Sequence, residues 1–79
     1  MISLSVVMPI FNEEKAIRRT LDELLPLCEE KGWPVIVVDD GSHDGTARIL
    51  DEFAPRLQIL RHPYNRGYGA SLKTGIRAA

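Results

Sequence analysis

The sequence has a single cysteine, Cys28, no excess of either charge and no long apolar run. One cysteine excludes an internal disulfide framework and favours a reducing compartment. Ten basic and eleven acidic residues leave a net charge of −1, so the overall charge does not point to nucleic acid or to an anionic membrane as a partner. No segment approaches the roughly 18 apolar residues that a membrane-spanning helix needs. The apolar start also lacks the basic flank and the cleavage site of a signal peptide.

The length of 79 residues allows one small domain. Residues 73–79 continue a helical pattern, and no stop signal follows them. We therefore expect residues 1–79 to be a single partial domain, the front portion of a longer protein.

Strand-like and helix-like patterns alternate along the chain. Runs rich in Val and Ile predict buried strands at residues 4–10, 35–38 and 57–60. Each run is followed by apolar residues at helical spacing: Ile17, Leu21, Leu24, Leu25 and Cys28, then Ile49, Leu50 and Phe53, then Leu72 and Ile76. The order β-α-β-α-β-α predicts an α/β fold, a Rossmann-like three-layer sandwich with a parallel sheet and helices on both faces.

Turn and cap residues set the expected boundaries of the first two helices. Asn12 is a suitable N-cap for the first helix, Pro26 should kink or shorten it, and Gly32 is a plausible end. Ser42 or Asp44 should cap the second helix.

Polar residues follow each predicted strand, at the edge where open α/β sheets bind ligands. Asp39 and Asp40 end the second strand, and adjacent residues of a strand point to opposite faces, so only one of them can easily face a ligand. Both could instead be turn and cap residues. Glu13 and Glu14 follow the first strand, where a favourable charge at a helix N-terminus explains at least one of them.

The segment from Asn65 to Gly75 carries glycines that open a predicted helix. Free N–H groups at such an N-terminus suit a phosphate, with Arg66 or Lys73 as helpers, although an ordinary turn with a solvated basic face is equally compatible. The segment also nearly matches the P-loop pattern, but Leu72 occupies the position of the second glycine. His43 and His62 lack partners at metal-ligand spacing, so we expect them at the surface or in turns.

Three blocks, VVMPIFNEE, VIVVDDGSHDGT and NRGYGASLKTGI, together resemble the family 2 glycosyltransferases. The resemblance is closest to the polyprenyl-phosphate branch, which includes dolichol-phosphate mannosyltransferase and undecaprenyl-phosphate sugar transferases. It implies the N-terminal part of the nucleotide-sugar-binding fold called GT-A. By resemblance, Pro9, Phe11 and Glu13 line the nucleoside pocket, and Val37 and Asp39 hold the base and ribose. Asp39 would then face the ligand, while Asp40 and Ser42 shape the turn.

The same resemblance implies the reaction of a longer protein. This longer protein would transfer a sugar from a UDP- or GDP-sugar to a polyprenyl phosphate at the cytoplasmic face of the membrane. Mg²⁺ or Mn²⁺ assists by neutralising the diphosphate leaving group. The family's metal-binding D-x-D motif, its catalytic base and its acceptor site would all lie beyond Ala79. No catalytic residue or metal ligand is therefore assigned to this chain, which we expect to be inactive alone.

Two alternatives come from other functional classes. A receiver-like signalling module would need an acceptor Asp at the end of the third strand, where this chain has Leu60-Arg61-His62-Pro63. A non-catalytic fragment could form homo-oligomers through an exposed sheet edge.

Overall fold

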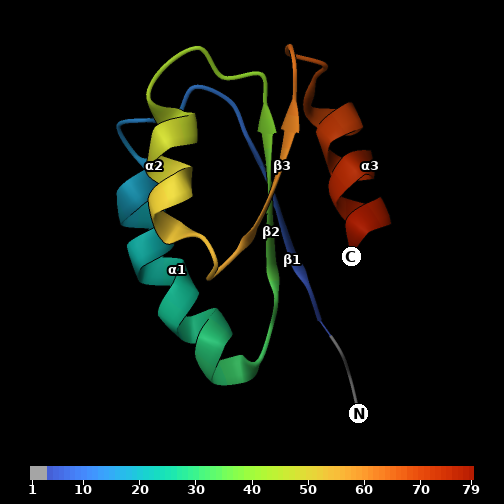
Figure 1. Cartoon of the computed structure of the whole chain (residues 1–79). Coiled ribbons are helices and arrows are strands. Elements are labelled where there is room, and N and C mark those ends of the chain that lie inside the picture. The colour runs from blue at the N-terminus through green and yellow to red at the C-terminus, as the bar shows by residue number, and fades with distance from the viewer. Residues whose placement is uncertain (1–3) are drawn as a thin grey trace.

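The computed structural model describes residues 4–79, which form three strands and three helices in strict alternation (Figure 1). The elements are β1 (Val6–Ile10), α1 (Ile17–Lys31), β2 (Val35–Asp40), α2 (Thr46–Phe53), β3 (Gln58–His62) and α3 (Tyr68–Ala78). The predicted order of elements is confirmed.

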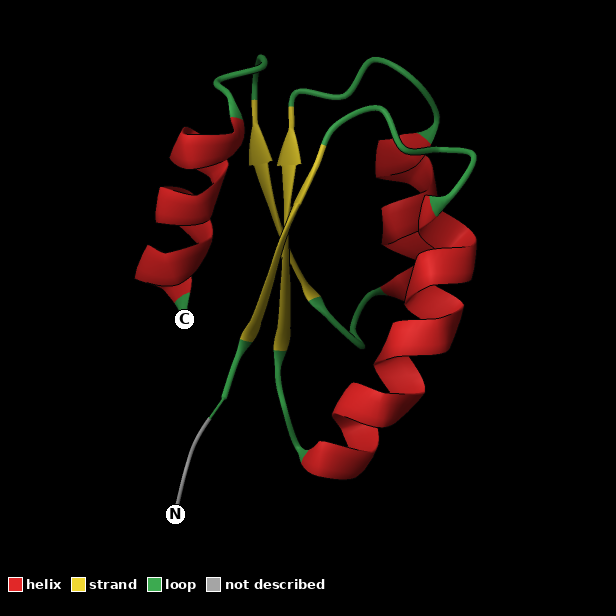
Figure 2. Cartoon of the chain, turned by 180° about the vertical axis from the view of Figure 1, so that it is seen from behind, coloured by secondary structure: helices red, strands yellow, loops and turns green. Residues whose placement is uncertain are grey.

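The sheet is parallel throughout, with β2 between β1 and β3. Helices α1 and α2 cover one face and α3 covers the other (Figures 1 and 2). All six residues of β2 are buried, as a central strand covered on both faces requires. The predicted α/β sandwich with a parallel sheet is therefore confirmed. Strands β1 and β3 are the edges, and each has one side without a strand partner among residues 4–79.

The main core lies between the sheet and the α1–α2 layer. Ile17, Leu21, Leu25 and Cys28 of α1 are buried there, as their helical spacing predicts. Pro26 lies inside α1 and does not end it, so of its two predicted effects the shortening is wrong and the kink stays a prediction. Gly32 ends the helix in the left-handed conformation (φ 73°), which a glycine adopts without a steric penalty.

The inner face of α3 differs from the prediction. Ser71 and Gly75 are its buried residues, whereas Ile76 is 64% exposed and Leu72 is half-buried. A Cβ on Gly75 would lie 2.3 Å from Val7 Cγ1. The small residues let α3 approach the sheet closely, and this close packing turns the larger apolar side chains away from it.

Two predicted strand ends are also displaced. Strand β2 continues through Asp40, and β3 continues through His62. The reason is pairing, because Asp39 lies opposite Arg61 and Asp40 lies opposite His62 in the parallel ladder. The prediction that His62 lies at the surface or in a turn is wrong, since it is a buried strand residue.

Candidate functional site

Three loops meet at the carboxyl ends of the strands, at the top of Figure 1. They are residues 11–16 after β1, residues 41–45 after β2 and residues 63–67 after β3. Each loop contains polar residues that the sequence analysis expected at the ligand-binding edge of the sheet. The strand ends therefore bring together residues that are far apart in the sequence.

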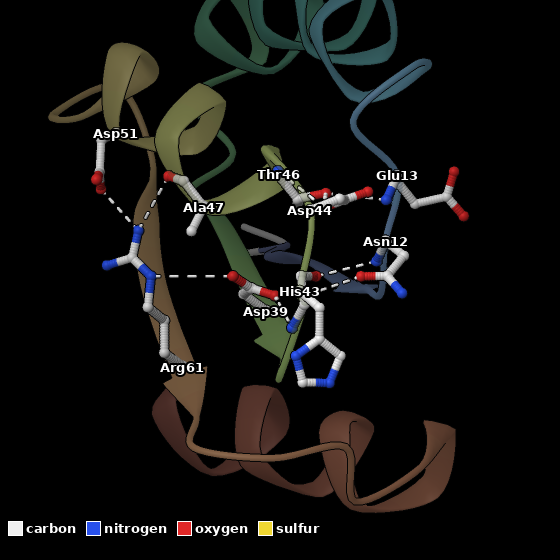
Figure 3. A network of polar contacts seen from close by, with 10 residues as sticks. Asn12, Glu13, Asp39, His43, Asp44, Thr46, Ala47, Asp51 and Arg61 are labelled. Atoms are coloured by element: carbon white, nitrogen blue, oxygen red, sulfur yellow. Dashed lines mark hydrogen bonds and ion pairs between the residues drawn. The ribbon is translucent and has the colours of Figure 1, made fainter.

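The first two loops are held together by the bonds of Asn12. Its backbone N–H donates to Ser42 Oγ (3.0 Å), and its Oδ1 accepts the backbone N–H of His43 (2.8 Å) (Figure 3). Asn12 has a positive φ of 51°, a conformation that asparagine tolerates better than most residues. It is therefore a link between loops, and the prediction that it caps α1 is wrong.

The two glutamates that follow add three bonds to this link. The N–H of Glu13 donates to Thr46 Oγ1 (2.9 Å), and the N–H of Glu14 donates to Asp44 Oδ2 (3.2 Å). In return, the N–H of Gly45 donates to Glu14 Oε2 (3.1 Å). We call this set of bonds between the first two loops the loop clamp. Glu14 therefore has a structural role, whereas the Glu13 carboxylate makes no hydrogen bond or ion pair within residues 4–79.

Asp44 lies at the centre of the loop clamp and at the start of α2. Its Oδ1 accepts both the N–H and the hydroxyl of Thr46. The Thr46 hydroxyl is the largest influence on Asp44 and, with the backbone donors, outweighs burial and lowers the pKa of Asp44. The N-cap of α2 is Gly45, so neither predicted cap occupies that position. Asp44 lies one residue before it and accepts the N–H of Thr46, and Ser42 bonds Asn12 instead.

Asp39 and Asp40 are both 3% exposed and face opposite sides of the sheet. Asp39 lies on the α1–α2 side, where its Oδ1 accepts the N–H of Ser42 (3.1 Å) and its Oδ2 lies 3.9 Å from Arg61 Nε (Figure 3). Arg61 is itself held by Asp51 Oδ1 (2.7 Å). Asp39 thus shapes the turn after β2 and keeps one oxygen without a hydrogen bond among residues 4–79.

Asp40 lies on the α3 side and makes more bonds. Its oxygens accept the N–H groups of Arg66 (2.9 Å) and Gly67 (2.8 Å), and Oδ1 lies 2.7 Å from His62 Nδ1. Because an ionised carboxylate only accepts, His62 Nδ1 carries the proton. The other ring nitrogen of His62 lies 2.8 Å from Thr74 Oγ1. We call Asp40, His62 and Thr74 the buried clamp, since it ties α3 and its loop to the strand ends.

Burial is the largest influence on the Asp40 carboxyl and acts to raise its pKa. The hydrogen bonds from His62, Arg66 and Gly67 together outweigh it, and the pKa of Asp40 is lowered. The carboxylate is therefore the stable form of this buried group.

Gly41 brings the second and third loops into contact. Its φ is +72°, and a Cβ at this position would lie 2.4 Å from the carbonyl carbon of Tyr64. Only glycine fits without a shift of the backbone.

A hollow of about 420 Å³ opens between the first and third loops. Its lining contains two carboxylates, a phenyl and a phenol ring, an amide and a serine hydroxyl, and no basic side chain. The residues are Pro9, Ile10, Phe11, Glu13, Asp40, Asn65, Gly67, Tyr68 and Ser71. Such a lining accepts N–H donors and offers ring faces, so it suits a polar heterocycle better than an anion.

The predicted site residues are only partly brought together here. Pro9, Phe11 and Glu13 line the hollow. Val37 is 0% exposed and belongs to the core, and Asp39 is absent from the lining, where its neighbour Asp40 takes part. The role of Asp39 toward a ligand stays a prediction.

Sequence reasoning did not single out Ser71 as a site residue. Ser71 is 0% exposed, lines the hollow, and its hydroxyl has no hydrogen-bond partner among the described residues. No sequence signal pointed to Ser71, because the spacing of Leu72 and Ile76 predicted a different inner face for this helix.

Arg66 and Lys73, the predicted helpers of a phosphate, lie elsewhere. They line a separate hollow of about 410 Å³ beside α3. Helix α3 begins at Tyr68, so residues 68–74 cannot form the phosphate-wrapping loop of the P-loop alternative.

Metal-ligating side chains are not gathered within residues 4–79. No group of three or more His, Cys, Asp or Glu residues there could hold an ion. The described residues therefore do not fit the Mg²⁺ or Mn²⁺ that the resemblance implies, nor the acidic cluster of a receiver-like module. Likewise, none of the helices formed by these residues is both long and apolar enough to cross a membrane.

Comparison with protein families and curated proteins gives consistent matches. The family model described as Glycosyl transferase family 2 matches residues 5–79. The chain is 34% identical to a dolichyl-phosphate beta-glucosyltransferase of Trichomonas vaginalis, over 91% of this chain and 25% of that protein. It is 39% identical to an undecaprenyl-phosphate 4-deoxy-4-formamido-L-arabinose transferase of Pectobacterium atrosepticum, over 98% of this chain and 25% of that protein. The chain thus spans about a quarter of the length of these relatives.

Solved structures match over almost the whole chain. Staphylococcus aureus TarS, residues 1–349, superposes with a TM-score of 0.84 and 28% identity, covering 99% of this chain and 24% of that one. A mannosyltransferase from Pyrobaculum calidifontis, solved with GDP-Man and Mn²⁺, superposes with a TM-score of 0.70 and 28% identity, covering 96% of this chain and 24% of that one.

Proposed function

Since the chain belongs to the family 2 glycosyltransferases, we propose that its three loops form the nucleoside half of a donor-sugar site. The observation that carries the proposal is the hollow lined by ring faces and carboxylates without a cation. A nucleobase presents a flat ring and N–H groups, which such a lining matches. The base would lie against Phe11 and Tyr68, with the Glu13 carboxylate accepting an N–H.

Asp39 and Val37 have supporting roles in this proposal. Asp39 Oδ2 makes no hydrogen bond among the described residues, but it faces the α1–α2 side, whereas the hollow is lined from the Asp40 side, so it accepts an N–H of the base only if the base extends across the end of β2. Because Asp39 is 3% exposed, the turn at Ser42 has to shift before a ligand reaches it. Val37 is buried in the core between the sheet and the α1–α2 layer, so in this proposal it holds the end of β2 in place and does not touch the base or ribose.

For the longer protein, we propose transfer of a sugar from a UDP- or GDP-sugar to a polyprenyl phosphate at the cytoplasmic membrane face. The names of the two curated relatives support the acceptor, and the GDP-Man bound to the solved mannosyltransferase supports the donor class. Its Mn²⁺ supports a metal requirement, which residues 4–79 do not meet by themselves. The role of this chain is therefore to bind and orient the nucleoside.

A titration of the ¹⁵N-labelled chain tests the nucleoside site. We expect uridine or guanosine, and UDP or GDP, to shift the amides of Phe11, Glu13 and residues 65–71, with or without Mg²⁺. Inorganic pyrophosphate serves as the control, because the hollow has no cation to hold it. Shifts of Phe11 and Glu13 that need Mg²⁺, or that pyrophosphate reproduces, would contradict the proposal.

Ser71→Ala tests the hollow itself. Removing an unpartnered buried hydroxyl should leave the free energy of unfolding unchanged or raise it. If the hydroxyl bonds the base after rotating about its Cα–Cβ bond, affinity should fall by about threefold to tenfold, the effect of one hydrogen bond. Thr20→Val, which removes an exposed hydroxyl on α1 away from the hollow, is the control for binding. Unchanged affinity in Ser71→Ala would remove Ser71 from the site.

The isolated chain should not transfer sugar. Incubation with UDP-glucose or GDP-mannose, a polyprenyl phosphate and Mn²⁺ should yield no glycolipid by mass spectrometry. Detection of a glycolipid above a no-protein control would refute this part of the proposal.

A further inference from the structure

The net charge of −1 conceals a strong separation of charge along the chain. Residues 1–52 contain all eleven acidic residues and five of the ten basic ones, a net charge of −6. Residues 53–79 contain the other five basic residues and no acidic one, a net charge of +5. The positive segment includes β3, the loop after it and all of α3.

Two of these five cations are neutralised by carboxylates and three are not. Arg56 pairs with Glu29 (2.8 Å), and Arg61 pairs with Asp51 (2.7 Å). Arg66, Lys73 and Arg77 form no ion pair within residues 4–79. These three line the hollow of about 410 Å³ beside α3, together with Gly69, Ala70 and Thr74.

Apolar side chains on α3 accompany these three cations, of which Arg66 lies in the loop just before the helix. Tyr68 is 71% exposed, Ile76 is 64% exposed, and the half-buried Leu72 lies between them. The three are spaced by four residues, so they form one row along the helix, next to the row that holds Lys73 and Arg77. We call Arg66, Tyr68, Lys73, Ile76 and Arg77 the basic face of α3. Figure 1 shows that α3 stands alone on its side of the sheet.

We propose that the basic face of α3 docks on the surface of an anionic lipid bilayer. Cations interspersed with exposed aromatic and aliphatic side chains are the composition of helices that lie in a membrane interface. The cations attract anionic headgroups, and Leu72 and Ile76 enter the boundary of the acyl chains, whereas Tyr68 stays at the edge beside the nucleoside hollow. A nucleic-acid partner would use the cations but would leave Ile76 without a function.

The position of the basic face adds a consequence that rests on the proposed nucleoside site. Tyr68 belongs to the basic face and also lines the nucleoside hollow. Docking of α3 would therefore place the donor site beside the bilayer that holds a polyprenyl-phosphate acceptor.

Sedimentation with vesicles tests the docking surface. Each Lys or Arg near an anionic surface contributes about fivefold in affinity, so three contribute on the order of a hundredfold. We expect binding to phosphatidylcholine vesicles that contain about 30% phosphatidylglycerol, little binding to pure phosphatidylcholine, and loss of binding when NaCl rises from about 0.05 M to 0.5 M.

Two triple variants give the matched comparison. Arg66→Gln/Lys73→Gln/Arg77→Gln should lose about a hundredfold in vesicle affinity. Lys15→Gln/Arg19→Gln/Lys31→Gln removes the same charge from exposed positions in and before α1, on the opposite side of the molecule, and should stay within about threefold of the parent chain. Circular dichroism establishes that both variants are folded.

Several results would overturn the proposal. They are equal losses in the two triple variants, no preference for anionic vesicles, or equal affinity for a short DNA duplex. Amide shifts at residues 66–77 with inorganic pyrophosphate but no vesicle binding would reassign the basic face to a soluble phosphate. The nucleoside titration is independent, because the basic-face variant retains Phe11 and Glu13. Loss of nucleoside binding alone would refute only the proposed function.

Discussion

Asp39 and Asp40 are adjacent in sequence and equally buried, yet they serve two different regions of the molecule. On the α1–α2 side, Asp39 shapes the turn that begins the partly exposed loop clamp. On the α3 side, Asp40 belongs to the buried clamp. Its other two partners, the N–H groups of Arg66 and Gly67, lie in the loop after β3. The alternation of side chains along β2 separates these regions, so we expect the two aspartates to contribute differently to stability.

The largest expected difference is between alanine substitutions of the two carboxylates. Asp40→Ala leaves His62 and two N–H groups without their acceptor and should cost about 3–5 kcal/mol of unfolding free energy. Asp39→Ala breaks one hydrogen bond and a long ion pair and should cost about 1–2 kcal/mol. Urea unfolding followed by circular dichroism measures both. Equal losses would mean that the two sides of β2 are not energetically distinct.

A pair of glycine substitutions on the α3 side should give opposite signs. Gly41→Ala places a methyl group against the backbone of Tyr64 at a positive φ and should cost about 2–4 kcal/mol. Gly69 lies inside α3 with open space around it, so Gly69→Ala should stabilise by about 0.5–1 kcal/mol. Thermal unfolding compares the two. A stabilised Gly41→Ala chain would show that the second and third loops do not approach as described.

The loop clamp is tested at its most buried member. Thr46 is 0% exposed, accepts the N–H of Glu13 and donates to Asp44, so Thr46→Val should cost about 1–2 kcal/mol. Thr20, exposed on α1, is the control, and Thr20→Val should change stability by less than about 0.5 kcal/mol. Matching effects in the two variants would mean that the hydroxyl of Thr46 contributes nothing to the clamp.

The smallest expected effect is a difference in pH dependence. Because the pKa of Asp40 is lowered in the folded chain, its contribution is present above the unfolded value, near 3.9, and is lost as the pH falls through the folded value. The unfolding free energy of Asp40→Asn and of the parent chain is measured between about pH 7 and pH 2. Below about pH 4, it should decline less steeply in Asp40→Asn than in the parent chain. Parallel curves would show that Asp40 titrates alike in both states.

Much of the fold follows from local sequence. The alternation of apolar runs and helical spacings predicted the order of elements, the parallel sheet, the burial of Cys28 and the end of α1 at Gly32, all of which the structure has. The three sequence blocks also predicted the family and the three loops that converge. These features depend on the periodicity of apolar residues and on the backbone preferences of single residues. Both can be read from a local segment without knowing which other segment it packs against.

Only the tertiary structure decided which residues meet. His62 is buried because parallel pairing places it opposite Asp40, and Asn12 became a link because the loop after β2 lies beside it. The inner face of α3 is Ser71 and Gly75 because the helix packs closely on Val7. The sequence by itself determined the elements and their order. The partners of Asp39 and Asp40, the lining of the hollow and the free cations of α3 depend on distances between elements, which no local pattern encodes.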